Sequence, residues 1–376
     1  MHPEKCIMSK FNTLKIKDIR KETEEAVSIA FEIPTDLVND YNYLPGQYVT
    51  LKLNIGGESY NRSYSLCSNP YADNEHRIAI KRVVGGKVST YLTQNAKVGE
   101  EIEVMLPLGN FHTDLKPEAK KHYYLFGAGS GITPLFSILK AVITNEPNSK
   151  VTLAYGNFNS DSVIFKGELN QLKQKYSERI TLLHVFDNPK KKGGFLGMGK
   201  KVDEELEFTE GRIDAIFVRN LLSQKNILDA EFFTCGPTGL MKAVEKTLND
   251  LNVDKKQIHV EYFTEKADAD KHAVSVGVSD ENYDGITQID VICDGKSHSF
   301  SMKGKETVLD ACSKNKVDPP FACMVGACTT CRCKLNEGSV EMGDCEALTP
   351  KEIEQGYILS CQAKPTSSKL SVNFDE

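Results

Sequence analysis

Four cysteines in the last quarter of the chain have a spacing that suits a metal cluster. Cys323, Cys328 and Cys331 follow one another as C-x4-C-x2-C, and Cys361 comes later in the chain. Four thiolates in this order are typical ligands of a [2Fe-2S] cluster, which gains and loses one electron at a time. A structural zinc site is the alternative, but such sites usually pair two short C-x2-4-C knuckles. The spacing therefore favours an iron–sulfur cluster and one-electron chemistry.

The residues beside these cysteines can supply the hydrogen-bond donors that a negatively charged cluster needs. Gly326 and Ala327 are small enough for the loop backbone to aim N–H groups at the sulfur atoms, and Thr329 and Thr330 add hydroxyls. The other cysteines of this region lie outside the pattern. We expect them to be small apolar core residues: Cys293, Cys312, Cys333 and Cys345.

A short helix is predicted ahead of the fourth cysteine. Thr349 is its N-cap, Pro350 its first residue, Glu352 completes a capping box, and Gly356 ends it. The helix brings Cys361 back toward the other ligands on a return segment.

A glycine-rich turn indicates a second chemistry, the binding of a nucleotide. GAGSGITP, from Gly127 to Pro134, follows an apolar strand and opens a helix, with Thr133 as the expected N-cap. Backbone N–H groups at such a helix start meet a pyrophosphate. A P-loop is not supported, because no Gly-Lys-Ser/Thr follows, and no acidic residue completes a strict dinucleotide fingerprint. The turn TCGPTG, from Thr234, also joins a strand to a helix, so both turns are expected at the carboxyl edge of one parallel sheet.

Three units must position these motifs. From Phe11 to about Phe111 apolar residues alternate with polar ones, which predicts a small antiparallel barrel or sandwich. After Lys121, strands alternate with amphipathic helices, which predicts a parallel sheet covered by helices. A polar stretch, residues 265–285, is expected to be a linker, and a third unit starts at Ile286. The insertion from Lys190 to Lys201 is expected to be a basic surface loop.

Composition excludes several classes of function. The 376 residues are 40% hydrophobic and 26% charged, with a formal charge of −6, and no apolar run is long enough to span a membrane. The mild acidity argues against a nucleic-acid partner. The first residues lack the pattern of a secretion signal, so we expect a cytoplasmic protein without a membrane partner.

Taken together, five motifs resemble those of one family. RSYS (62–65), GGKVSTYL (85–92), GAGSGITP, TCGP and EYF (261–263), followed by a plant-type ferredoxin spacing, are similar to the ferredoxin-NADP reductase-like oxidoreductases. The resemblance implies a multidomain α+β fold: an FAD-binding antiparallel β-barrel (1–115), an α/β NAD(P)-binding domain with a parallel sheet (116–264), the linker (265–285), and a β-grasp 2Fe-2S ferredoxin domain (286–376).

The resemblance also implies roles for single residues. Arg62 would pair with the flavin phosphates, Tyr64 would stack on the flavin ring, and Ser65 would hydrogen-bond near flavin N5. Ser65, Cys235 and Glu261 would be the catalytic residues. Further cofactor-binding residues implied in this way are Gly86, Val88, Ser89, Thr90, Gly127, Gly129, Gly131, Thr133, Pro134, Cys235, Gly236, Pro237 and Phe263.

One position departs from the family. Phe158 stands where relatives often carry an arginine that holds the adenosine 2′-phosphate of NADP. NADPH is expected from the resemblance, and NADH is the alternative. FAD is expected over FMN for the same reason.

The order flavin, nicotinamide, ferredoxin resembles most closely the reductase subunits of phenylacetyl-CoA epoxidases, which serve a di-iron oxygenase. The implied function is transfer of electrons from NAD(P)H through FAD and the [2Fe-2S] cluster to that oxygenase component. A reductase of another Rieske or di-iron oxygenase, or an iron–sulfur redox-sensing module, are the alternatives.

Overall fold

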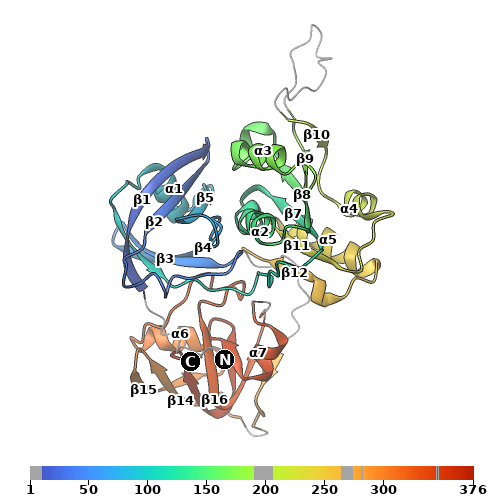
Figure 1. The fold of residues 1–376 in the computed structure, drawn as a ribbon. Coiled ribbons are helices and arrows are strands. Elements are labelled where there is room, and N and C mark those ends of the chain that lie inside the picture. The colour runs from blue at the N-terminus through green and yellow to red at the C-terminus, as the bar shows by residue number, and fades with distance from the viewer. Residues whose placement is uncertain (1–10, 190–205, 264–273, 281–282, 344, 346) are drawn as a thin grey trace, which may run out of the picture.

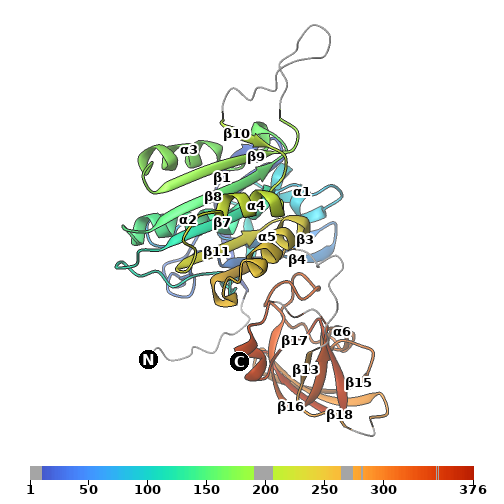
Figure 2. The ribbon, with the colours of Figure 1, turned by 90° about the vertical axis from the view of Figure 1, so that its right-hand side faces the viewer.

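The computed structural model describes residues 11–189, 206–263, 274–280, 283–343, 345 and 347–376. Figure 1 shows three units. A barrel, drawn in blue, lies beside a sheet with helices, drawn in green and yellow, and the C-terminal unit, drawn in orange and red, lies below both. Figure 2, turned by 90°, shows the same arrangement from the side. The expected multidomain α+β architecture is confirmed.

The first unit is an antiparallel sheet that closes on itself. Its strand order is β4-β3-β6-β1-β2-β5. Leu66, directly after β4, bridges Ile78 in β5, so the two edge strands meet. Closure removes exposed strand edges and encloses an apolar core. The elements are β1 (Phe11–Thr23), β2 (Ala26–Glu32), β3 (Tyr48–Ile55), β4 (Glu58–Ser65), β5 (His76–Lys81), α1 (Lys87–Gln94) and β6 (Glu101–Met105).

The second unit is a parallel sheet with the order β10-β9-β8-β7-β11-β12. The chain runs outward from β7 to β10 and then returns to β11 on the other side of β7, so the strand order reverses between β7 and β11. The elements are β7 (His122–Ala128), α2 (Ile132–Asn145), β8 (Lys150–Asn157), α3 (Lys166–Lys175), β9 (Ile180–Phe186), β10 (Phe208–Glu210), α4 (Ala215–Leu222), β11 (Ala230–Cys235), α5 (Thr238–Asp250) and β12 (Ile258–Glu261).

The third unit is a mixed sheet with the order β13-β16-β18-β14-β15, on which α6 packs. β14 and β18 are parallel neighbours, as in a β-grasp fold. The elements are β13 (Val274–Val276), β14 (Ile286–Cys293), β15 (Lys296–Lys303), α6 (Val308–Lys314), β16 (Arg332–Met342), α7 (Pro350–Glu354), β17 (Tyr357–Leu359) and β18 (Ala363–Asn373).

Polar contacts between α2 and the loop before β5 hold the first two units together. Ser137 Oγ donates to the Ser68 carbonyl oxygen at 2.6 Å, and Lys140 Nζ lies 2.5 Å from an Asp73 carboxylate oxygen. Ser137 is fully buried. The edge of the sheet at which β7 and β11 end therefore faces the barrel.

Two features differ from the expectations. α2 begins at Ile132 with Gly131 as its N-cap, because residues 129–131 form a 3-10 turn, so Thr133 lies inside the helix and donates to the Ser130 carbonyl oxygen. Val274–Val276, within the stretch expected to be linker, is a strand that pairs with β16. The C-terminal sheet thus starts before Ile286.

Among the described residues, no helix combines the length and the apolar character that crossing a bilayer requires. The cytoplasmic location stays a prediction. Residues 265–273 and 281–282 of the expected linker, and the insertion from Lys190 to Lys201, lie outside the described residues.

Candidate functional site

A cavity of about 780 Å³ lies where the three units meet. The barrel, the glycine turn after β7 and the loop before β16 all contribute to its wall. The predicted site residues that line it are Arg62, Tyr64, Ser65, Gly86, Val88, Ser89, Thr133, Glu261, Phe263, Cys323 and Cys328. This cavity therefore brings together residues from the barrel, the parallel-sheet unit and the C-terminal unit.

The barrel side of the cavity is built on β4. Ser65 is buried, and Tyr64 is a half-buried phenol whose pKa is raised because the protein shields it from water. The Arg62 guanidinium donates to the Asn61 carbonyl oxygen at 2.7 Å and keeps further N–H groups for an anion. Arg62 can bind a phosphate, Tyr64 can stack on a planar ring, and Ser65 can hydrogen-bond to a ring nitrogen. The three side chains therefore fit a flavin.

The turn before α1 is closed by a serine. Ser89 Oγ accepts the Val83 N–H at 3.1 Å, and a Cβ atom on Gly86 would lie only 2.6 Å from that oxygen. Only glycine at this position lets the backbone approach the hydroxyl so closely. Thr90, predicted to bind with Ser89, does not line the cavity.

The two glycine turns of the parallel sheet lie side by side, as predicted. Gly127 in β7 pairs with Cys235 in β11, so both turns leave the sheet at the same edge. A Cβ atom on Gly131 would clash with the Cys235 carbonyl group. Gly129 and Gly236 have φ angles of +54° and +153°, which favour glycine. Ser130 and Thr133 of the first motif line the large cavity.

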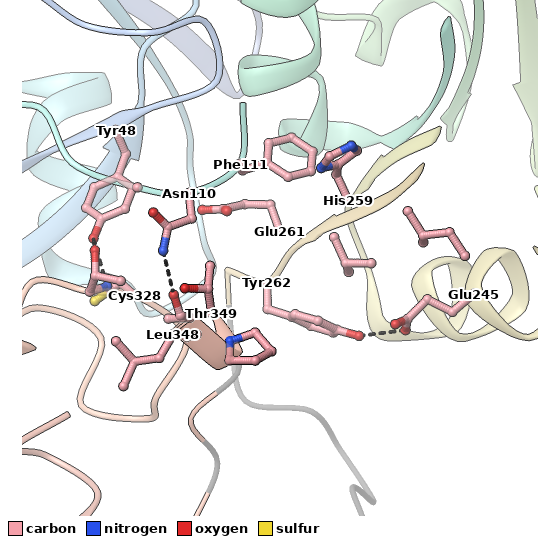
Figure 3. Close-up of a pocket in the computed structure, with 17 residues that line it drawn as sticks. Tyr48, Asn110, Phe111, Glu245, His259, Glu261, Tyr262, Cys328, Leu348 and Thr349 are labelled. Carbon is pink, nitrogen blue, oxygen red and sulfur yellow. Dashed lines mark hydrogen bonds between the residues drawn. The ribbon is translucent and has the colours of Figure 1, made fainter. Parts of the chain in front are cut away.

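Cys235 and Glu261 are neighbours on β11 and β12, but they differ in their position relative to the large cavity. Glu261 lines the large cavity and a second one of about 330 Å³, drawn in Figure 3. Burial raises the pKa of the Glu261 carboxyl group, and the nearby Cys328 sulfur adds to this shift, so that the pKa is about 8. Cys235 is fully buried behind the turn and lines neither cavity, and burial raises the pKa of its thiol. Gly127, Gly129, Gly131, Pro134, Gly236 and Pro237 also lie outside the lining of the large cavity.

The four predicted cluster ligands come together as two pairs. Cys331 Sγ and Cys361 Sγ are 3.3 Å apart, and the Cys323 and Cys328 side chains hydrogen-bond each other. Two pairs of thiols suit the two irons of a [2Fe-2S] cluster, with two protein ligands for each iron.

Backbone donors surround these sulfur atoms, as predicted for the loop. The Val325 N–H lies 3.5 Å from Cys323 Sγ. Hydrogen bonds from the Cys331 thiol and then from the Gly326 backbone lower the pKa of Cys361. Gly326 adopts a φ of +75°, which lets the loop curl around the sulfurs.

The helix ahead of the fourth ligand is confirmed. Thr349 and Glu352 form the predicted capping box, with Pro350 at the start and Gly356 at a φ of +83° after the end. Arg332 Nη1 pairs with Glu352 at 2.7 Å and ties the helix to β16.

The sequence did not reveal every residue that lines the large cavity. Tyr48, Tyr60 and Lys81 are examples, and none of them belongs to a motif with a recognisable spacing. The feature that could have pointed to Tyr48 is the pairing of β3 with β4, which places it opposite Ser65.

Phe158, which follows β8, is 57% exposed.

Three families of known protein domains match this chain. Residues 13–113 match the family described as Oxidoreductase FAD-binding domain, residues 125–246 the Oxidoreductase NAD-binding domain, and residues 291–366 the 2Fe-2S iron-sulfur cluster binding domain.

Two relatives are similar over nearly their whole length. A subunit of the 1,2-phenylacetyl-CoA epoxidase of Escherichia coli K12 is 36% identical over 372 residues, 98% of this chain and 99% of the relative. The ferredoxin reductase component of 3-ketosteroid-9-alpha-monooxygenase from Rhodococcus rhodochrous is 34% identical, with 96% of each chain covered. The solved phthalate dioxygenase reductase shares the fold, with a TM-score of 0.55 and 21% identity over 96% of this chain and 98% of its own.

The cavity, the cysteine pairs and these similarities lead to one conclusion. The chain is an oxidoreductase that belongs to the family of FAD- and NAD-binding reductases with a C-terminal 2Fe-2S ferredoxin domain, the family of reductase components of oxygenases.

Proposed function

We propose that this reductase delivers electrons from NADPH to the oxygenase component of a di-iron phenylacetyl-CoA epoxidase. The observation that carries the proposal is the single cavity lined by the flavin strand, the nucleotide turn and two cluster cysteines. The 36% identity to one subunit of a phenylacetyl-CoA epoxidase, over nearly both full lengths, supports the choice of partner.

Bound FAD would supply the chemistry that links a two-electron hydride transfer from the nicotinamide to one-electron transfers toward the [2Fe-2S] cluster. The chain's own residues would hold and align these groups. In the proposal Arg62 pairs with flavin phosphates, Ser65 donates to the reacting edge of the ring, and Tyr64 covers its face. Glu261, at the junction of the two cavities, borders the same reacting region.

The nucleotide lies on the turns after β7 and β11 in this proposal. Backbone N–H groups at the start of α2 would meet its pyrophosphate. NADPH is proposed on family resemblance. NADH is the second candidate because the exposed Phe158 offers no cation to a 2′-phosphate.

The decisive experiment mixes the purified holoenzyme with NADPH or NADH in a stopped-flow instrument without oxygen. We expect the flavin absorbance to bleach first and the cluster absorbance to bleach afterwards. Absence of both events would support a sensing module and contradict the proposal.

The partner is tested by adding purified oxygenase components. We expect faster turnover with the oxygenase of a phenylacetyl-CoA epoxidase than with that of a 3-ketosteroid-9-alpha-monooxygenase. The second partner is a specific alternative because its reductase is 34% identical to this chain. The reverse order of rates would assign the chain to that other class of oxygenase.

A further inference from the structure

A tyrosine of the barrel is hydrogen-bonded to the cluster loop. Tyr48, at the start of β3, accepts the Thr329 backbone N–H at 2.9 Å, and the Tyr48 and Thr329 hydroxyls are 3.0 Å apart. Thr329 lies between the ligands Cys328 and Cys331. Figure 3 shows the Tyr48 phenol pointing from the barrel toward the loop at Cys328.

A second hydroxyl extends this contact to the flavin motif. Thr50 Oγ1 lies 3.1 Å from Thr330 Oγ1 and 3.0 Å from the Ser63 hydroxyl on β4. Thr50 and Tyr48 are two residues apart on one strand, so they share a face of the sheet. Across the strand pair, Tyr48 faces Ser65 and Thr50 faces Ser63. The strands that carry the predicted flavin residues therefore also hold the loop with the predicted cluster ligands.

Apolar packing keeps the phenol in place. Tyr48 is only 3% exposed and forms a buried cluster with Ala322 and Cys328. A Cβ atom on Gly109 would lie 3.0 Å from the Tyr48 ring, so that glycine lets the backbone lie against it. A fixed ring with its hydroxyl on a backbone N–H holds that N–H at a defined place.

We propose that Tyr48 is a positioning residue for the transfer of one electron from the reduced flavin to the oxidised cluster. The inference rests on the proposed function and assigns one residue a role in its electron-transfer step. By holding the Thr329 backbone, the phenol fixes the loop segment between two cluster ligands against the flavin strands. It also keeps that N–H away from the cluster sulfurs, and hydrogen bonds to sulfur are among the factors that set a cluster's potential.

The test compares Tyr48→Phe with Tyr41→Phe in the full-length holoenzyme. Tyr41 is also a buried tyrosine, it belongs to the barrel's own core, and its hydroxyl donates to the Val104 carbonyl oxygen at 2.6 Å. Both variants lose one buried phenol hydroxyl. Rapid mixing with NADPH and NADH follows the flavin and cluster absorbances, and a redox titration followed by electron paramagnetic resonance gives the cluster potential.

In Tyr48→Phe we expect cluster reduction to slow by about fivefold to tenfold relative to flavin reduction, because the loop loses the hydrogen bond that fixes it. The cluster potential should move to a less negative value, because the freed N–H can donate to a ligand sulfur and so favours the more negative reduced cluster. A less negative potential alone would speed cluster reduction, so a slower rate reports the lost positioning. In Tyr41→Phe neither quantity should change. Cluster reduction and potential in Tyr48→Phe that equal those of Tyr41→Phe would overturn the inference.

Thr50→Val provides a second variant if Tyr48→Phe binds too little iron. It removes the hydroxyl between Ser63 and Thr330 and leaves Tyr48 in place, so a slower cluster reduction with unchanged flavin reduction supports the same device. Failure of the proposed function looks different. In that case the unmodified protein itself would show no flavin reduction, or a reduced flavin with no later cluster reduction.

Discussion

The sulfur atoms of Cys331 and Cys361, two of the predicted ligands, lie 3.3 Å apart. Cys333 belongs to the same buried core as these two residues, so burial does not distinguish it from a ligand. The spacing of the cysteines carries the ligand assignment.

Replacing Cys361 with alanine should therefore abolish cluster binding. Three thiolates leave one iron without its fourth ligand. We expect the iron content and the cluster absorbance to be lost, while NADPH still reduces the flavin, because the barrel and the parallel sheet have cores of their own. Cys333→Ala is the matched control and should keep its iron. Equal iron contents in the two variants would contradict the ligand assignment.

Position 158 affects, in our prediction, the relative preference for NADPH and NADH. Its side chain is 57% exposed, so Phe158→Arg costs little packing and places a guanidinium at the carboxyl end of β8. An arginine pairs bidentately with a phosphate. The ratio of kcat/KM for NADPH to that for NADH should rise by at least about tenfold, or about 1.4 kcal/mol. Phe158→Leu should leave the ratio unchanged, and an unchanged ratio in Phe158→Arg would place the 2′-phosphate elsewhere.

At the scale of elements, the join between β7 and α2 depends on a glycine. A side chain at Gly131 would clash with the Cys235 carbonyl of the neighbouring turn. Gly131→Ala should push the two turns apart and weaken nucleotide binding by at least about tenfold, measured by titrating the flavin spectrum with NADP⁺ and NAD⁺. Gly167, in α3, has open space around it. Gly167→Ala should leave binding unchanged and stabilise the fold by about 0.5–1 kcal/mol.

Strands β1, β2 and β5 are tied together by a buried arginine. Arg77 donates to Asp18, Ser28 and Glu75 and is only 4% exposed. Its hydrogen bonds lower the pKa of both carboxyl groups below their ordinary values. Because the folded values are the lower ones, this stabilisation is complete above the ordinary carboxyl range and is lost as the pH falls through the lowered values.

We therefore expect Arg77→Met to lower the free energy of unfolding near neutral pH by about 2 kcal/mol and to reduce its decline in acid. Urea unfolding, followed by the fluorescence of released flavin at several pH values, measures both effects. Arg20→Met is the control, since Arg20 contacts the same carboxylates but has a half-exposed side chain. It should cost less than about 1 kcal/mol. Equal effects of the two substitutions would argue against burial as the cause.

At the scale of the whole molecule, the electron path ends on an acidic domain. Residues 286–376 carry ten Lys and Arg against thirteen Asp and Glu, a formal charge of −3 before any cluster is added. Docking to a basic acceptor protein should therefore weaken as salt screens the charges. We expect the rate of cytochrome c reduction to fall steadily between about 0.05 and about 0.5 M NaCl.

Electron transfer from the flavin to the cluster, within the molecule, serves as the internal control for this salt dependence. The flavin strands meet the cluster loop largely through neutral hydroxyls, with Lys52 and Asp318 at 3.9 Å as a more distant ion pair. The rate of cluster reduction after mixing with NADPH should therefore change little with salt. A cytochrome rate that is equally insensitive would mean that charge does not guide docking.

Local chemistry in the sequence predicts the ligand set, and it determined both glycine turns and the capped helix before Cys361. Thiolate spacing, glycine placement and the Thr349–Glu352 capping box each act within a few residues, so their effect can be recognised along the chain. The alternation of apolar and polar residues in β3 predicted a strand. It could not reveal that Thr50, on the polar face of this strand, is buried where the ferredoxin domain contacts it.

Tertiary structure alone decided how the units meet. Tyr48 and Thr329 are 281 positions apart, and their contact follows from the combined packing of a barrel, a parallel sheet and a ferredoxin domain. Tertiary contacts also bury Cys235 behind a turn and pair Val274–Val276 with β16 of the last sheet. Contacts between distant segments depend on the shapes of whole surfaces, and no short run of residues encodes such a shape.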